Sequence, residues 1–128
     1  MVDAMLKRGF KDMLAEANAV VETVSVQDLN YHLEDPDTLL VDVRGAAERE
    51  SEGTIPGSLH VPRGLLEFHA DPESPVYKDD LRPERRLILF CGTGGRSALA
   101  AKTLLDMGYA DVASLAGGYA AWRKSERE

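Results

Sequence analysis

The stretch Leu87-Ile88-Leu89-Phe90-Cys91-Gly92-Thr93-Gly94-Gly95-Arg96-Ser97 decides the fold of this chain. Its first four residues form a continuous apolar run, the pattern of a strand buried on both faces of a parallel sheet. A glycine-rich loop follows. The residues from Ser97 to Met107 are then rich in alanine and leucine and end at Gly108, which predicts a helix.

The rest of the chain repeats this alternation of strands and helices. A second apolar run at 38–43 predicts another buried strand, and Pro36 ends the helix before it. The remaining patterns predict short strands at 21–24, 59–62 and 112–115, and helices at 25–34, 46–52 and 119–127. Residues 68–83 contain three prolines and several aspartates and are expected to be mostly loop. Together these patterns predict an α/β fold with a mainly parallel central sheet flanked by helices.

A further helix is predicted at the N-terminus, outside this alternation. Apolar residues recur at helical spacing over residues 10–20, which indicates a short amphipathic helix. A chain of 128 residues is long enough for one compact domain. We therefore expect an N-terminal helical extension at 1–21 docked on a single domain at 22–128.

The composition of the chain argues against two classes of binding partner, nucleic acids and membranes. The net charge is −7 and the sequence pI is about 4.9, and an acidic surface works against non-specific binding to nucleic acid or anionic membranes. The longest apolar run, 87–91, is far shorter than the roughly 20 residues of a membrane-spanning helix. We expect a cytoplasmic protein without nucleic-acid or membrane partners.

Cys91 is the only cysteine. No intramolecular disulfide and no cysteine-rich zinc site can form, and the three histidines are too far apart in sequence to indicate a metal site. A lone cysteine is most often a buried apolar residue. The context of Cys91 favours a functional role instead, because the carboxyl ends of parallel strands open onto the ligand crevice and a helix begins directly after the loop.

The loop after Cys91 has the features of an anion site. Its three glycines allow backbone N–H groups to approach a ligand, and the helix N-terminus and the Arg96 guanidinium both favour negative charge. The same groups lower the pKa of a cysteine and raise the fraction of its nucleophilic thiolate. Cys91 is thus the predicted nucleophile, and the substrate-binding residues are Gly92, Thr93, Gly94, Gly95, Arg96 and Ser97.

Two kinds of reaction use such a loop: phosphoryl transfer to cysteine, and transfer of sulfane sulfur through a cysteine persulfide. The phosphatase pattern has five residues between cysteine and arginine, whereas four separate Cys91 from Arg96. A cysteine-based phosphatase or arsenate reductase is therefore the less favoured reading.

Four motifs together resemble the rhodanese-like family over about residues 22–124. They are Asp42-Val43-Arg44, the segment Gly53-Thr54-Ile55-Pro56-Gly57-Ser58 leading to Val61-Pro62, the loop 91–97, and Leu115-Ala116-Gly117-Gly118-Tyr119 with Trp122. The resemblance implies a rhodanese fold in which Cys91 accepts sulfur as a persulfide and passes it on. A six-residue loop from Cys91 to Arg96 is similar to the sulfurtransferase version, whereas relatives with a seven-residue loop are phosphatases.

The expected reaction moves sulfur from a small anionic donor such as thiosulfate to cyanide or to a thiol, which could belong to a protein. No cofactor or metal is required. The alternative is a persulfide carrier or binding module that does not turn over by itself.

The chain departs from the family pattern outside the loop. Thr54 and Ser58 stand where the family often has histidine and alanine, and Arg49 stands where an aromatic residue commonly follows the family glutamate. Either Glu48 or Glu50 could take the place of that glutamate.

Three further residues are candidates for the rim of the site. Asp42 and Arg44 follow the buried strand at 38–43 and could shape the crevice, although a structural network of paired charges is the favoured interpretation. Arg63 either places a second positive charge over the site or is a solvated surface residue.

Overall fold

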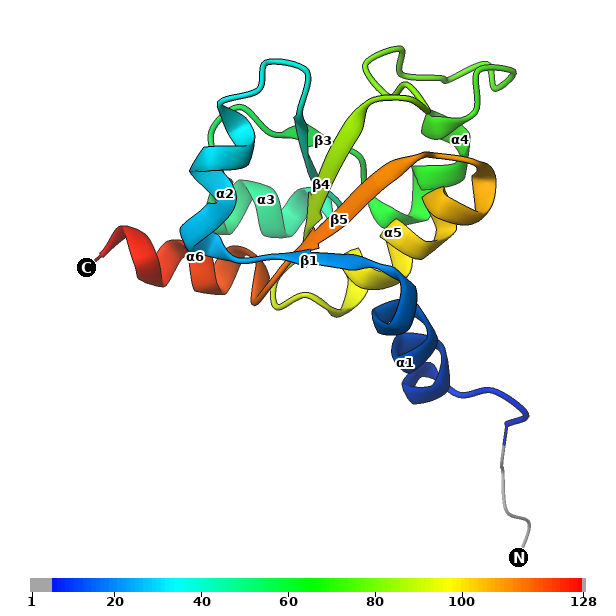
Figure 1. Cartoon of the computed structure of the whole chain (residues 1–128), viewed down its shortest axis with the longest axis horizontal. Coiled ribbons are helices and arrows are strands. Elements are labelled where there is room, and N and C mark those ends of the chain that lie inside the picture. Colours follow the sequence, from blue (N-terminus) through cyan, green and yellow to red (C-terminus); the bar gives the residue numbers. More distant parts are fainter. Residues whose placement is uncertain (1–5, 128) are drawn as a thin grey trace, which may run out of the picture.

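The computed structural model describes residues 6–127 and contains one five-stranded parallel sheet with the strand order β1-β5-β4-β2-β3 (Figure 1). The strands are β1 (Glu22–Val24), β2 (Leu39–Asp42), β3 (Leu59–His60), β4 (Arg86–Phe90) and β5 (Asp111–Leu115). The helices are α1 (Phe10–Val20), α2 (Val26–Leu33), α3 (Ala46–Glu52), α4 (Leu66–Ala70), α5 (Gly95–Met107) and α6 (Gly118–Glu126), with a 3₁₀ turn η1 at Arg63–Leu65. The predicted α/β class and parallel sheet are confirmed.

Strand β4 lies in the middle of the sheet and is buried on both faces. Leu87 and Leu89 pack into a core with residues of α4 and α5, whereas Ile88 and Phe90 pack into a second core with residues of α2 and α6. This alternation explains why the strand is apolar at each of these positions. Its neighbours β2 and β5 both run parallel to it, so the carboxyl ends of the three strands meet at one edge.

Several element boundaries differ from the predictions. Helix α5 begins at Gly95 rather than Ser97, because Gly94 adopts a positive φ of 116° and serves as its N-cap. Residues 68–83 are mostly loop, as predicted, except that their first three residues belong to α4, which covers Leu66–Ala70. Leu66 and Ala70, four residues apart, are both buried in the core beneath α5, and this tertiary burial stabilises a helix of only five residues.

The predicted N-terminal helix is confirmed at Phe10–Val20. Ala17 is fully buried, and α1 packs against α5, whereas Phe10 is 66% exposed. Residues 1–5 of the predicted extension lie outside the described residues, and the division of the chain at residue 21 remains a prediction. No helix within residues 6–127 combines the length and the apolar character needed to cross a membrane.

Candidate active site

Cys91 follows β4 directly, at the edge of the sheet where the parallel strands end. Cys91 is two residues beyond Leu89, so its side chain lies on the same face of the sheet as Leu87 and Leu89, in the core beneath α5. Only 1% of the residue is exposed. The sulfur is thereby placed at the amino end of α5, where backbone N–H groups have no partners within the helix.

The sulfur is held by groups of its own loop. The backbone N–H of Gly94 donates to Cys91 Sγ at 3.1 Å, and Ser97 Oγ lies 3.5 Å from the sulfur. Burial acts to raise the pKa of Cys91, but hydrogen bonds from the Ser97 hydroxyl and from backbone N–H groups outweigh it and lower the pKa below its ordinary value. The site therefore favours the nucleophilic thiolate.

Besides the sulfur, the Ser97 hydroxyl contacts the hydroxyl of another serine, which the sequence did not reveal. Its Oγ lies 2.8 Å from Ser114 Oγ on β5, and it can donate to Gly94 O at 3.1 Å. Both serines are buried, which restricts their hydroxyl groups to these partners. The sulfur is thus the end of a hydrogen-bonded series, Cys91–Ser97–Ser114.

Substituting Ser97 by alanine is expected to raise the pKa of Cys91, because the variant lacks the side-chain hydrogen bond to the sulfur. The rate of alkylation by iodoacetamide, measured as a function of pH, should reach half its maximum at a higher pH than in the parent protein. Ser51→Ala, which changes an exposed hydroxyl on α3, is the control. An unchanged midpoint in Ser97→Ala would show that the backbone donors alone set the pKa.

Arg96 is paired with Glu48 of α3. Its Nη1 and Nη2 donate to the two carboxylate oxygens of Glu48 at 2.6 and 2.9 Å. The hydrogen bond from Arg96 is the main reason that the pKa of Glu48 falls to about 2, so the pair stays ionised at neutral pH. Arg96 also lies over Gly92, where an added Cβ would be 3.3 Å from Nη2. Its charge is therefore held beside the loop and partly balanced, which the sequence did not predict.

Glu48 is placed for this pairing by the first turn of α3. It is the third residue of the helix, and its Oε1 accepts a hydrogen bond from Gly45 N at 3.2 Å. Of the two candidate glutamates, Glu48 is therefore the one that contacts Arg96 of the loop. The spacing of Gly45 and Glu48 matches a capping interaction, the one sequence signal that could have singled out this glutamate.

Helix α6 supports the loop from the other side. Tyr119 N donates to Cys91 O at 2.8 Å, and Ala120 N donates to Gly92 O at 3.0 Å. Gly118 has a φ of +58°, and a Cβ at this position would lie only 2.4 Å from Cys91 O. Gly118 is thus required by the close approach of the two backbone segments, whereas a Cβ at Gly117 would instead lie 2.6 Å from Ala121 Cβ of α6.

Asp42 and Arg44 form a buried network rather than a rim. Both side chains are fully buried, and Arg44 Nη2 donates to Asp42 Oδ2 at 2.9 Å and to Gly53 O at 2.7 Å. The Arg44 guanidinium also lies 4.3 Å from the centroid of the Tyr119 ring. These contacts correspond to the structural network favoured from the sequence and correct the alternative in which the two residues line the crevice.

The three departures from the family pattern contact one another. Arg49 Nη1 donates to Asp42 Oδ2 at 3.2 Å, and Thr54 Oγ1 donates to the same oxygen at 2.9 Å. Ser58 completes the cluster, because its Oγ lies 3.0 Å from Thr54 Oγ1 and its carbonyl accepts from Arg49 at 3.1 Å. Arg49, Thr54 and Ser58 therefore form one polar cluster around Asp42.

Arg63 does not lie over the loop. Its guanidinium donates to Glu67 at 3.0 Å and to Thr103 at 3.3 Å. Thr103 is eight residues beyond Gly95 in α5, about 12 Å along the helix axis. The reading of Arg63 as a second positive charge at the site is corrected accordingly.

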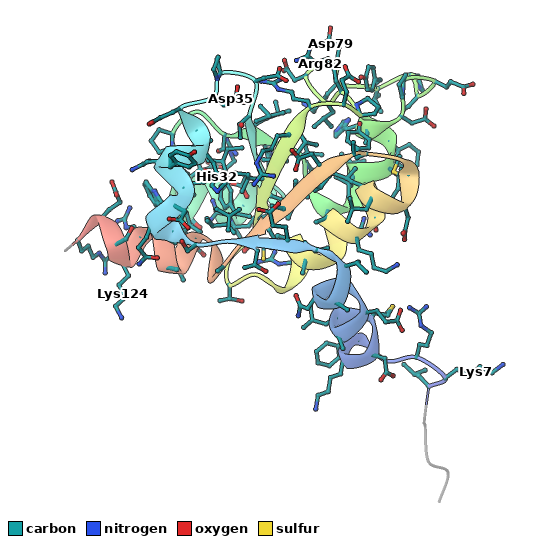
Figure 2. All side chains as sticks on the ribbon, in the orientation of Figure 1. Lys7, His32, Asp35, Asp79, Arg82 and Lys124 are labelled. Carbon is teal, nitrogen blue, oxygen red and sulfur yellow. The ribbon has the colours of Figure 1, made fainter. Side chains whose placement is uncertain are left out.

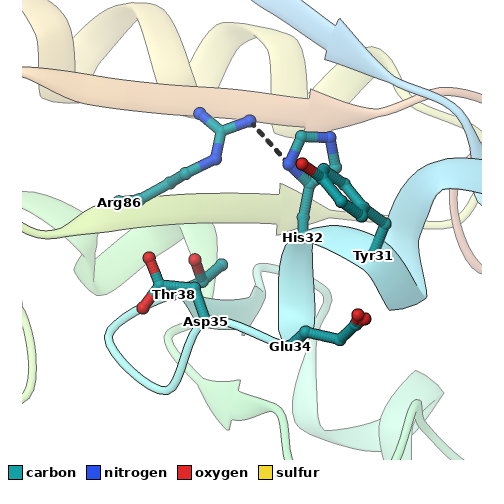
Figure 3. A pocket seen from close by; sticks show the side chains of 6 residues that line it. All are labelled: Tyr31, His32, Glu34, Asp35, Thr38 and Arg86. Carbon is teal, nitrogen blue, oxygen red and sulfur yellow. Dashed lines mark hydrogen bonds between the residues drawn. The ribbon is translucent and has the colours of Figure 1, made fainter.

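A pocket at the opposite edge of the sheet is separate from this site. It is lined by Tyr31, His32, Glu34, Asp35, Thr38 and Arg86. Figure 3 shows Arg86 beside His32, and Arg86 Nη2 lies 3.5 Å from His32 Nδ1. Arg86 begins β4, whereas Cys91 follows its end. Figure 2 places Asp35 at the top of the view and Lys124 of α6 at its lower left. This pocket is therefore not part of the candidate active site around the cysteine loop.

Comparisons with known proteins agree with this geometry. The family model described as "Rhodanese-like domain" matches residues 25–125. The chain is 32% identical over 106 residues to a sulfurtransferase of Allochromatium vinosum, covering 82% of this chain and 91% of that protein. It is also 31% identical over 110 residues to the human thiosulfate:glutathione sulfurtransferase, covering 81% and 95% of the two chains.

Among solved structures, a Rhodopseudomonas palustris protein of unknown function, described as a possible tyrosine phosphatase, superposes with a TM-score of 0.90. The two sequences are 41% identical, and the match covers 98% of this chain and 97% of the other. This match, unlike that of the family model, extends over α1. The matched motifs, the parallel sheet and the cysteine loop show that the chain belongs to the rhodanese-like family.

Proposed function

We propose that the protein is a sulfurtransferase in which Cys91 carries sulfane sulfur as a persulfide. The observation that carries this proposal is the position of Cys91 Sγ, which accepts a hydrogen bond from Gly94 N–H at the amino end of α5 and has a lowered pKa. The similarity to two named sulfurtransferases supports the same activity.

In the first half-reaction the Cys91 thiolate attacks the outer sulfur of an anionic donor such as thiosulfate. A bond forms between Sγ and that sulfur, the S–S bond of the donor breaks, and sulfite leaves with the electron pair. The anionic end of the donor is stabilised by Arg96 and by loop N–H groups. The enzyme then holds the sulfur as a cysteine persulfide, which is covalent catalysis by an activated nucleophile.

In the second half-reaction an acceptor removes the outer sulfur. A thiolate or cyanide attacks it, the bond to Sγ breaks, and Cys91 is released as the thiolate that the loop favours. The human relative is named for thiosulfate and glutathione, which supports a thiol acceptor for this chain. Every group in this cycle belongs to the protein or to its substrates, so the proposal includes no metal or organic cofactor.

The proposal is tested by incubating the protein with thiosulfate and measuring its intact mass and its production of thiocyanate from cyanide. A gain of about 32 Da, the mass of one sulfur atom in a covalent intermediate, is expected in the parent protein and not in Cys91→Ser. Thiocyanate formation should be abolished in the same variant.

Other outcomes would replace this function by another. A stable persulfide that neither cyanide nor small thiols discharge would identify a carrier whose partner completes the reaction. Hydrolysis of an aryl phosphate that is lost in Cys91→Ser, without any persulfide, would identify a phosphatase, the activity suggested for the Rhodopseudomonas palustris protein.

A further inference from the structure

Strand β5 carries a buried serine among the apolar residues that lie beneath α5. Ser114 is two residues beyond Val112, so the two side chains lie on the same face of the sheet, and Val112 belongs to the core that contains Cys91. Ser114 is also paired in register with Leu89 of β4, another member of this core. Only 5% of Ser114 is exposed. Because burial of a hydroxyl group costs free energy unless the group is hydrogen-bonded, the partner of Ser114 explains its position.

The hydroxyl of Ser114 has one partner among the residues that the structure describes. Its Oγ lies 2.8 Å from Ser97 Oγ, and either hydroxyl could donate. Ser97 has other partners, because its hydroxyl can donate to Gly94 O at 3.1 Å and lies 3.5 Å from Cys91 Sγ. An alanine at position 114 would therefore leave the Ser97 hydroxyl hydrogen-bonded. The need to satisfy Ser97 does not account for Ser114.

The hydrogens of the three side chains can be counted in each state of the sulfur. A serine hydroxyl has one hydrogen to donate and can also accept. When Cys91 is a thiol, its S–H can donate to Ser97 Oγ, and the Ser97 hydrogen is then directed to Gly94 O or to Ser114 Oγ. When Cys91 is a thiolate, its sulfur can only accept. The Ser97 hydrogen can then be directed to the sulfur, and Ser114 can donate its own hydrogen to Ser97 Oγ.

Donation from Ser114 favours the arrangement that stabilises the thiolate. A Ser114 hydroxyl that donates to Ser97 Oγ does not compete with the sulfur for the Ser97 hydrogen. It also polarises the O–H bond of Ser97, and hydrogen bonds in such a series strengthen one another in a low-dielectric interior. The effect adds to the hydrogen bond that the sulfur accepts from Gly94 N at 3.1 Å. Ser114 therefore acts on the sulfur through Ser97.

The charged groups beside the sulfur are separate from this pair of serines. The pKa of Arg96 is raised mainly by Glu48 of α3 and to a smaller extent by Cys91, so Arg96 is the cation that acts on the sulfur. Its guanidinium is held by the two carboxylate oxygens of Glu48. Within residues 6–127, neither of these charged side chains is hydrogen-bonded to Ser97 or Ser114. A change at position 114 therefore leaves this ion pair in place.

We propose that Ser114 is a positioning residue of the reaction, whose hydroxyl directs the Ser97 hydrogen to Cys91 Sγ when the sulfur carries negative charge. This role rests on the proposed function and extends it. In the first half-reaction the charge lies on the attacking thiolate, and in the second it returns to Sγ when the bond to the outer sulfur breaks. In the persulfide the charge lies on the outer sulfur, and the Ser97 hydrogen can return to Gly94 O. Ser114 thus assists both half-reactions.

A matched pair of substitutions at position 114 tests this role. Ser114 borders a hollow of about 280 Å³ that also touches Thr23 and Gly94, which leaves room for one added methyl group. Ser114→Thr keeps the hydroxyl, and Ser114→Val has the same shape without it. At about one pH unit below the parent midpoint, the rate of Cys91 alkylation by iodoacetamide should fall about 2- to 10-fold in Ser114→Val, the range expected for one hydrogen bond. Ser114→Thr should restore the parent rate, and the rate at high pH should be the same in all three proteins.

The same substitution in a Ser97→Ala background separates positioning from a general disturbance of the loop. Because Ser114 acts through the Ser97 hydroxyl, Ser114→Val should not change the alkylation midpoint further once that hydroxyl is absent. Thr23→Val is the control, since it removes an exposed hydroxyl beside the same hollow, and it should match the parent protein. An equal shift in both backgrounds, or equal losses in Ser114→Thr and Ser114→Val, would overturn the proposal.

Sulfur transfer provides the second measurement. In single turnovers with thiosulfate at the same pH, Ser114→Val should lower the maximal rate of persulfide formation about 2- to 10-fold. The thiosulfate concentration that gives half this rate should stay unchanged, because the donor is bound by Arg96 and the loop N–H groups. A rise in that concentration at an unchanged maximal rate would assign Ser114 to donor binding and overturn its positioning role. Failure of the proposed function is distinguishable, because alkylation requires no sulfur donor and no persulfide would then form in the parent protein.

Discussion

Replacing Asp42 by alanine is expected to lower the free energy of unfolding by about 3–5 kcal/mol, since removal of one partner leaves the other charge of a buried pair uncompensated. The side chains of Asp42 and Arg44 are both completely buried, with 0% of each accessible to solvent. Arg49 and Thr54 lose the same carboxylate acceptor. For a chain of this size the melting temperature should fall by roughly 10–20 °C.

Thermal and urea unfolding of Asp42→Ala measure this effect, and Asp37→Ala is the matched control. Asp37 pairs with Arg82, but its side chain is 60% exposed, and an exposed pair contributes only about 0–1 kcal/mol. A loss in Asp42→Ala no larger than in the control would show that the Arg44 guanidinium is accommodated without its carboxylate.

The pH dependence of the free energy of unfolding provides a second test of the prediction for Asp42→Ala. Burial acts to raise the pKa of Asp42, but hydrogen bonds from Arg44 and Thr54 outweigh it and lower the pKa below its ordinary value. A carboxyl group whose pKa is lower in the folded state stabilises the fold above its unfolded pKa, and this contribution is lost as the pH falls through the folded value. The difference in stability between the parent protein and Asp42→Ala should therefore shrink in acid.

Gly118→Ala is expected to reduce the rate of sulfur transfer at least about 100-fold, the scale of loss when reacting groups are displaced by about 1 Å. The new Cβ would lie 2.4 Å from Cys91 O and 2.9 Å from both C and O of Gly92, all of them backbone atoms. Relief of this overlap must separate α6 from the loop and disturb the position of Cys91 Sγ. The measurement is thiocyanate formation together with persulfide formation followed by mass.

Gly108→Ala is the control that separates backbone strain from the steric clash with the loop. Gly108 also has a positive φ, +110°, but no atom lies within 4 Å of its added Cβ. This control shares the backbone strain of an L residue in a left-handed conformation and lacks the clash with the loop. Equal transfer rates in the two variants would mean that the contact between Gly118 and Cys91 does not set the geometry of the site.

The tertiary structure decided how the charges of the site are partnered. The sequence showed Arg96 at the end of a glycine-rich loop, but its partner Glu48 lies 48 residues away on another helix. Asp42 and Arg44 were recognisable as a motif, whereas their contacts with Gly53 and Thr54 depend on how the segment after α3 returns to the sheet. Such contacts depend on packing between distant segments, which local patterns do not specify.

The apolar run 87–90, its single following cysteine and the glycine-rich loop were sufficient to predict a buried parallel strand with a nucleophile at its carboxyl end, because strand burial, turn geometry and helix initiation are local properties. The predicted strand and helix are present, with α5 extended by one half turn to Gly95. Only the tertiary structure placed Ser114 behind Ser97 and Glu48 beside Arg96. Those placements bring together side chains from separate helices and strands, and the energy of packing the whole core determines them.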